Sequence, residues 1–183
     1  ASNLVGVAGK RTEVKDWVKS RWDSLARSVN KMGYKVYQVG SKDDEKIENC
    51  DKYFLGVDYR LTLSLVEQCK TWVSIDTFLQ HGGYAVKKSG VVLFGSTNPK
   101  IYGHDLNTNI YHTVCNTVEC LHGNTDRWQW QFHESKCPLE GSESMKWMKS
   151  ISVDEVAGEI ENLLKVGWLD RKHVSLPLEK FTC

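Results

Sequence analysis

The chain has 183 residues, of which 40% are hydrophobic and 26% are charged, a composition typical of one globular domain with its own core. Its 24 Lys and Arg residues nearly balance its 23 Asp and Glu residues, so the net charge predicts no nucleic-acid partner and no attraction to anionic membranes. Because no apolar run approaches the roughly 20 residues that a membrane-spanning helix needs, we predict no transmembrane segment.

The cysteines and the N-terminus indicate the compartment. Six cysteines are too few for a disulfide-held scaffold in a chain of this length. The N-terminus lacks the basic start and the apolar stretch of a secretion signal, and we expect a cytoplasmic protein with reduced thiols. The chain begins with Ala1 rather than Met and enters an apolar segment at Leu4. We therefore expect a processed or excised piece of a longer protein.

Short apolar runs alternate with segments of helical periodicity. The predicted strands cover residues 4–8, 35–39, 53–55, 72–75, 91–94 and 110–114. The predicted helices cover residues 18–32, 43–49, 61–69, 77–87 and 152–165. This alternation is typical of right-handed βαβ units, and it predicts a Rossmann-like, doubly wound parallel sheet in a single α/β domain over residues 1–183.

Two helix ends carry local signals. Gly33 follows apolar residues at helical spacing and predicts a helix end there. Ser152 and Glu155 have the spacing of a capping box, which predicts the start of the last helix. Before this helix lies an irregular segment rich in Cys and Trp, about residues 115–149, and after it comes a tail, residues 166–183. The irregular segment is longer than an ordinary loop, so we expect it to be functional or partly structured.

That irregular segment contains side chains that zinc prefers: Cys115, Cys120, His122, His133 and Cys137. Their spacing is looser than that of structural zinc sites, which pair cysteines through two to four residues. We favour thiols packed among the tryptophans and predict no metal.

Polar residues follow two neighbouring strands of the predicted sheet. Asp76 and Thr77 come after the strand of residues 72–75, and Thr97 comes shortly after that of residues 91–94. In an open parallel sheet, ligands bind outside the carboxyl ends of the strands, where helix N-termini offer N–H groups to anions. We therefore expect a phosphate-bearing ligand here. The alternative for Asp76 is an N-cap, which stabilises a helix by about 1 kcal/mol without any function.

The helix after Thr77 contains His81, Gly82 and Gly83. Two glycines inside a helix cost about 1 kcal/mol each relative to Ala, so we expect a neighbouring strand or a ligand to approach closely. His81 lies one turn beyond Thr77 on the same face. The residues alone leave a packed histidine and a ligand-binding histidine equally open.

These segments resemble glycosyltransferase family 9, the ADP-heptose:lipopolysaccharide heptosyltransferases and their relatives. In the C-terminal, donor-binding half of that family a strand ends in Ser-x-Asp-Thr-Gly-x-x-His, which is similar to residues 74–81 here. The next strand ends in Phe-Gly-x-Thr-x-Pro, here residues 94–99. Residues 15–17 (Lys-Asp-Trp) and 151–156 (Ile-Ser-Val-Asp-Glu-Val) are also similar, and the resemblance covers about residues 3–165.

The resemblance implies one half of a two-domain GT-B glycosyltransferase that is metal-independent and inverts the anomeric carbon. The donor would be a nucleotide-diphosphate sugar, such as ADP-linked heptose or a related sugar, with no further cofactor. The acceptor would be a lipopolysaccharide-type glycan or glycolipid, bound through an N-terminal half that also carries the carboxylate base, so the catalytic residues are unknown. The implied location is cytoplasmic, peripheral at the inner membrane.

The resemblance also implies which residues bind the donor. Lys15, Thr77 and the helix N-terminus would contact the phosphates, where positive groups stabilise the leaving diphosphate. Thr97 would close the site.

Three further donor-binding roles follow from the same resemblance. Glu45 would bind the ribose hydroxyls. Asp76 would cap the helix or accept hydrogen bonds from sugar hydroxyls, because a free carboxylate repels a diphosphate. His81 would donate to a phosphate or to the donor sugar.

One residue departs from the family pattern. Phe78 stands where the family has the Gly that lets a diphosphate approach the backbone. We expect this side chain to block or reshape that approach. The alternative to an enzyme domain is therefore a non-catalytic, glycosyltransferase-like binding module.

Overall fold

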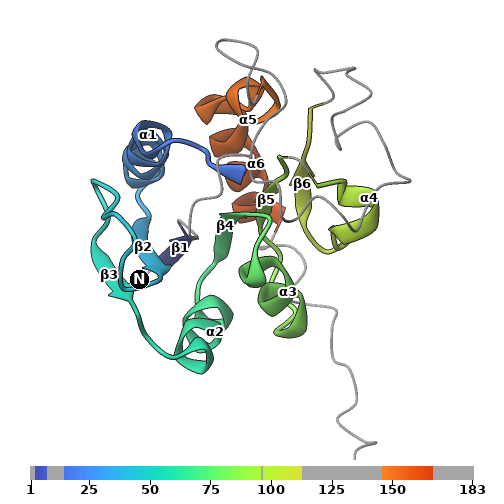
Figure 1. The fold of residues 1–183 in the computed structure, drawn as a ribbon. Coiled ribbons are helices and arrows are strands. Elements are labelled where there is room, and N and C mark those ends of the chain that lie inside the picture. The colour runs from blue at the N-terminus through green and yellow to red at the C-terminus, as the bar shows by residue number, and fades with distance from the viewer. Residues whose placement is uncertain (1–2, 8–14, 96, 113–145, 167–183) are drawn as a thin grey trace, which may run out of the picture.

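The computed structural model describes residues 3–7, 15–95, 97–112 and 146–166. Its centre is a six-stranded sheet of order β3-β2-β1-β4-β5-β6 (Figure 1). The strands are β1 (Asn3–Val7), β2 (Lys35–Gly40), β3 (Lys52–Leu55), β4 (Thr71–Ile75), β5 (Val91–Leu93) and β6 (Thr108–Ile110). All neighbouring strands are parallel. The carboxyl ends of all six strands therefore lie at one edge, and the predicted doubly wound parallel sheet is confirmed.

Helices pack on both faces of this sheet (Figure 1). They are α1 (Lys19–Lys31), α2 (Tyr59–Gln68), α3 (Phe78–Ala85), α4 (Pro99–Tyr102), α5 (Lys146–Ser150) and α6 (Val153–Val166). Helices α1, α5 and α6 share one apolar cluster with the sheet, and α2 and α3 share the other. Among the described residues, no helix has the length and apolar character needed to cross a membrane.

The central strand β4 explains the two clusters. All five of its residues are buried, as expected for an inner strand of a parallel sheet that is covered on both faces. Val73 and Ile75 belong to the cluster with α1 and α6, whereas Trp72 belongs to the cluster with α2 and α3. Successive side chains point to opposite faces, so one short apolar strand contributes to both layers.

Both predicted helix-end signals are confirmed. Gly33 follows the C-cap of α1 with φ of +86°, a conformation that Gly adopts readily. At the start of α6, the Ser152 hydroxyl accepts a hydrogen bond from the Glu155 backbone N–H at 3.1 Å.

Three predictions about elements need correction. The strand expected from residue 110 onward is β6, which begins at Thr108 and ends at Ile110. Residues 43–49 form no helix. The buried Gln38 side chain captures this segment instead, since its Nε2 donates to the Glu45 carbonyl at 2.9 Å and its Oε1 accepts from the Ile47 N–H at 2.8 Å. The end of the segment predicted to be irregular forms α5, with Trp147 and Met148 in the core.

Candidate functional site

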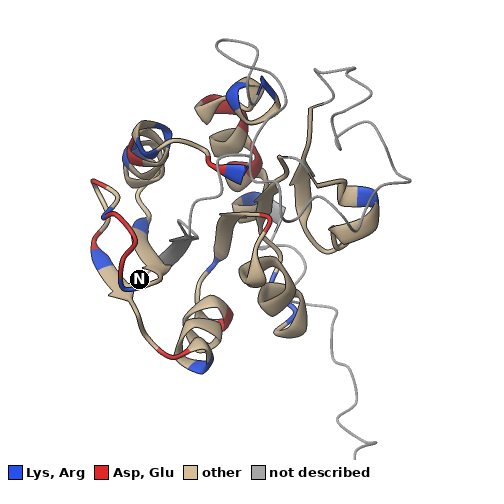
Figure 2. Cartoon of the chain, in the orientation of Figure 1, with Lys and Arg blue, Asp and Glu red and all other residues tan. Residues whose placement is uncertain are grey.

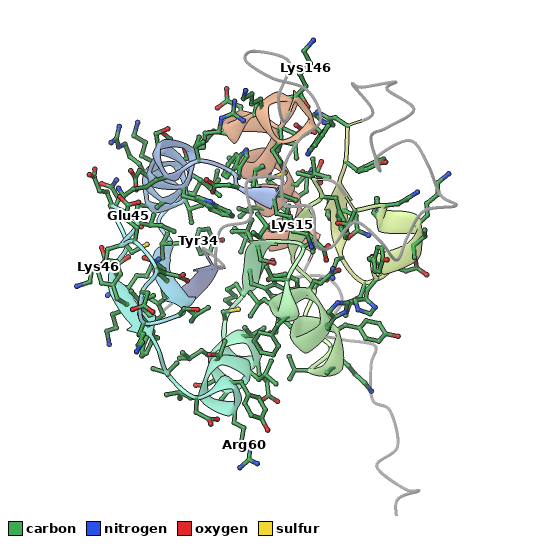
Figure 3. The ribbon with its side chains drawn as sticks, in the orientation of Figure 1. Lys15, Tyr34, Glu45, Lys46, Arg60 and Lys146 are labelled. Carbon is green, nitrogen blue, oxygen red and sulfur yellow. The ribbon has the colours of Figure 1, made fainter. Side chains whose placement is uncertain are left out.

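Three segments far apart in the sequence meet at the carboxyl edge of the sheet. Asp76 directly follows β4, Thr97 follows β5, and Lys15 precedes α1. The Lys15 ammonium lies 2.8 Å from Oδ2 of Asp76, and the Thr97 hydroxyl donates to the same oxygen at 2.6 Å. Lys15 also donates to the Asp76 backbone carbonyl at 3.2 Å. Three of the predicted donor-binding residues thus form one cluster, and Figure 3 shows Lys15 in the middle of the molecule.

The Asp76 carboxylate is buried, with 7% of the residue exposed. Its second oxygen, Oδ1, accepts a hydrogen bond from Nε2 of Gln80. A buried carboxylate is costly unless it is paired and hydrogen-bonded, and three side chains provide those partners here. Asp76 therefore fixes the Lys15 ammonium at the start of α3.

The segment that carries Lys15 is anchored through Trp17, two residues further on, which is 1% exposed. The indole N–H of Trp17 donates to the Ile151 carbonyl at 2.9 Å, and Arg21 Nη1 donates to the same oxygen at 2.8 Å. The segment before α1 is thereby anchored to the connection between α5 and α6. Residues 15–17 and 151–156, which share the family resemblance, thus meet in space.

Thr77, not Asp76, is the N-cap of α3. The Thr77 hydroxyl accepts a hydrogen bond from the Leu79 backbone N–H at 3.4 Å. The predicted Asp76 cap is wrong because Lys15, Thr97 and Gln80 take up its carboxylate. The N-terminus of α3, with its positive end of the helix dipole, adjoins the Lys15 ammonium.

His81 lies one turn into α3 and is exposed. Its Nδ1 lies 2.9 Å from Nε2 of His104, in the turn after α4. The His104 ring also stacks on Tyr84, with centroids 4.1 Å apart and planes at 8°. Burial and the neighbouring His81 lower the pKa of His104, while Asp105 acts in the opposite direction.

Gly82 and Gly83 are explained by packing rather than by a ligand. A Cβ at Gly83 would lie 2.5 Å from Cζ2 of Trp72 on β4, and a Cβ at Gly82 would overlap Leu63 of α2. The glycines let α3 lie close to β4 and to α2. The alternative in which a neighbouring strand approaches the helix is therefore confirmed for Gly83.

Phe78 is the first residue of α3 and is 50% exposed. Its Cε2 lies 3.5 Å from the position that a Cβ would take on Gly82. The ring therefore rests against the next turn of its own helix while leaving half of its surface open.

Glu45 lies apart from the Lys15 cluster, on the connection between β2 and β3 (Figure 3). Strand β1 separates β2 from β4 in the sheet. Acidic residues gather on this connection (Figure 2), and their negative charge disfavours a phosphate there.

Reasoning from the sequence missed two residues of this region, Gln80 and His104. Gln80 lies four positions after Asp76, a helical spacing that could have indicated it. No local pattern connects His104 with His81. The cysteines and histidines considered for zinc lie outside the described residues, and within the described ranges no group of three metal-binding side chains occurs.

Comparison with known proteins identifies the family. The model of glycosyltransferase family 9 (heptosyltransferase) matches residues 3–127, more than half of the chain. No curated protein sequence gives a significant match.

Solved structures share the fold at low identity. E. coli ADP-heptose LPS heptosyltransferase II is 18% identical, with a TM-score of 0.64 over 90% of this chain and 47% of that chain. The family 9 glycosyltransferase of Veillonella parvula DSM 2008 is 18% identical, with a TM-score of 0.63 over 90% of this chain and 46% of that chain.

A third similar structure is the dodecameric iron-containing heptosyltransferase TibC, in complex with ADP-D-β-D-heptose. It is 13% identical, with a TM-score of 0.71 over 91% of this chain and 46% of that one. Another structure of TibC comes from enterotoxigenic E. coli H10407. The chain thus spans a little under half of these solved proteins, and it belongs to glycosyltransferase family 9.

Proposed function

We propose that this chain is the nucleotide-diphosphate-sugar-binding half of an inverting glycosyltransferase that transfers heptose or a related sugar to a lipopolysaccharide-type glycan. The observation that carries the proposal is the cluster of Lys15, Asp76 and Thr97 at the carboxyl edge of the sheet. It adjoins a helix N-terminus, and parallel α/β sheets bind ligands at this edge.

The chemistry of sugar transfer assigns a role to each member of the cluster. As the bond from sugar to diphosphate breaks, negative charge grows on the diphosphate. The Lys15 ammonium and the N–H groups at Thr77–Leu79 stabilise that charge. Asp76 holds Lys15 in position, and Thr97 fixes the carboxylate of Asp76. The substrate supplies its own leaving group, so the proposal includes no cofactor and no metal.

The other half of the enzyme would supply the remaining parts. The chain spans 47% of E. coli heptosyltransferase II, so we assign the carboxylate base and most of the acceptor site to the missing N-terminal portion. Similar solved proteins include one complexed with ADP and one complexed with ADP-D-β-D-heptose, which supports an ADP-linked donor. Transfer to lipopolysaccharide would take place in the cytoplasm, at the inner membrane.

A second candidate function is a binding module without catalysis. Phe78 favours it, because a half-exposed ring at the first position of α3 replaces a Gly in the family pattern. In that case the fold would serve contacts with another protein and would not bind a diphosphate.

Calorimetric titration with ADP, UDP and GDP tests the first function. We expect at least one nucleotide to bind, and Lys15→Met to weaken binding at least tenfold, since it removes one charge-assisted contact. Lys35→Met is the matched control, because Lys35 is exposed at the amino end of β2, on the opposite edge of the sheet. Absence of binding at millimolar nucleotide would favour the binding module, and equal weakening by both variants would refute the site.

Phe78→Gly separates the two functions further. If Phe78 narrows a diphosphate site, the Gly variant binds nucleotide more tightly than the wild-type chain. An affinity that is unchanged or lower would contradict a blocked approach to α3.

A further inference from the structure

His81 and His104 form a hydrogen-bonded pair, and contacts to His104 hold that residue in place. The rings lie at 89° to one another, with Nδ1 of His81 2.9 Å from Nε2 of His104. Tyr84 stacks on the His104 ring. The His104 carbonyl accepts hydrogen bonds from the Asn107 N–H at 3.0 Å and from Asn109 Nδ2 at 3.2 Å. Both the ring and the backbone of His104 are thereby held in place.

The shared hydrogen bond selects a tautomer. One of the two nitrogens must carry the proton between them. If His104 donates, both rings are in the Nε2–H form, which a neutral imidazole prefers in water. If His81 donates, both rings are in the less favoured Nδ1–H form. The favoured arrangement therefore leaves Nδ1 of His81 as the acceptor and Nε2 of His81 protonated.

Nε2 of His81 keeps its hydrogen when the pair takes up one proton. If the proton is on His81, both nitrogens of that ring carry hydrogens, including Nε2. A proton on His104 leaves its Nε2–H donating to His81 as before. Among the described residues, Tyr84 on α3 stacks on the His104 ring. Asp105 raises the pKa of His104, whereas His81 lowers it. Double protonation is thus the disfavoured state.

We propose that His104 is a positioning residue that keeps Nε2 of His81 protonated, so that His81 presents an N–H donor to a phosphate or sugar oxygen. Within the described part of the chain, no residue makes a hydrogen bond to this nitrogen. The Nε2–H of a neutral His81 can then serve as a donor. The ligand contact rests on the proposed function, whereas the proton state of the pair does not.

Nuclear magnetic resonance tests the proton state directly. Two-bond ¹H–¹⁵N correlation spectra of the ¹⁵N-labelled chain distinguish histidine tautomers, and His81→Gln assigns the His81 signals. At pH 8 we expect Nε2 of His81 to be protonated and Nδ1 to accept a hydrogen bond. His104→Phe keeps an aromatic ring against Tyr84, and it should return His81 to the averaged shifts of a free imidazole. A proton on Nδ1 of His81, or shifts that His104→Phe leaves unchanged, would overturn the proposal.

Calorimetry with ADP and inorganic pyrophosphate tests the ligand contact. We expect His104→Phe to bind several-fold more weakly than the wild-type chain, because the exposed His81 ring loses the hydrogen bond that orients it as well as the partner that selects its tautomer. Leu106→Ala, an exposed change in the same turn, should bind as the wild type does. Equal affinity of His104→Phe and wild type would overturn the positioning role. A wild-type chain that binds neither ligand would refute the proposed function and the contact with it, while the spectra still decide the proton state.

Discussion

Asp76 joins the sheet, α3 and the segment before α1 through one buried carboxylate. Replacing it by Asn removes the negative charge that pairs with the Lys15 ammonium and accepts a hydrogen bond from Thr97. Because the Lys15 side chain keeps 20% exposure and can turn toward water, we expect a loss of about 1–3 kcal/mol in the free energy of unfolding. Urea denaturation measures this value.

Thr97→Val is the matched comparison for Asp76→Asn. It removes one hydrogen bond to the carboxylate and keeps the ion pair, so we expect about 1 kcal/mol of destabilisation. An Asp76→Asn variant as stable as the wild-type chain would show that the ion pair contributes nothing to folding.

Cys50 provides a separate chemical prediction. Burial, followed by the nearby Asp51 and Asp23, raises the pKa of its thiol to about 12. Only the thiolate reacts with alkylating reagents, so we expect iodoacetamide at pH 8 to leave Cys50 unmodified in the folded chain and to modify it in urea. Mass spectrometry of the digested protein gives the result. Rapid labelling without urea would place Cys50 in a different environment.

The places of individual residues in the fold could be predicted where motifs were local. Asp76, Thr77 and Thr97 follow strands that could be recognised as short apolar runs, and the structure brings Asp76 and Thr97 together. The partner of His81 could not be predicted, since nothing in the residues between them indicates that His104 folds back on α3. Contacts of this kind depend on the path of the loop and not on periodicity.

The close contact of α3 with β4 depends on Gly83. In Gly83→Ala the new methyl group would meet the Trp72 indole, with 2.5 Å to Cζ2, and α3 must move outward. We expect a loss of about 1–3 kcal/mol from overpacking, measured by urea denaturation. Gly158→Ala on α6 is the control, because a Cβ there has nothing within 4 Å, and it should gain up to about 1 kcal/mol of helix propensity. Equal effects of the two substitutions would contradict the described packing.

Helices with strong periodicity or caps were predictable, and short polar segments were not. The apolar residues at helical spacing in α6, together with the Ser152 cap, predicted the position of this helix to within about one residue. The prediction of a helix at residues 43–49 was wrong. It relied on acidic residues at the start of the segment, although the segment lacks the apolar face of a packed helix. The long-range capture of this segment by the Gln38 side chain has no signature in its own residues.

In the described part of the chain, helices cover both faces of a parallel sheet whose strands all end at one edge (Figure 1). Alternation of strands and helices predicted this class, since parallel strands require crossover helices. The order β3-β2-β1-β4-β5-β6 places β1 and β4 side by side at the centre. In open α/β sheets the ligand crevice lies where the strand order reverses, and here that point is between β1 and β4. Lys15 and Asp76 lie beside it.

The most direct test of the diphosphate site is a map of backbone amide chemical shifts during titration with ADP. The proposed site predicts the largest shifts at Thr77, Phe78 and Leu79, with a smaller response at Thr97 and none at Lys35 on the opposite edge. Shifts confined to the amino edge of the sheet, or no shifts at millimolar ADP, would contradict it.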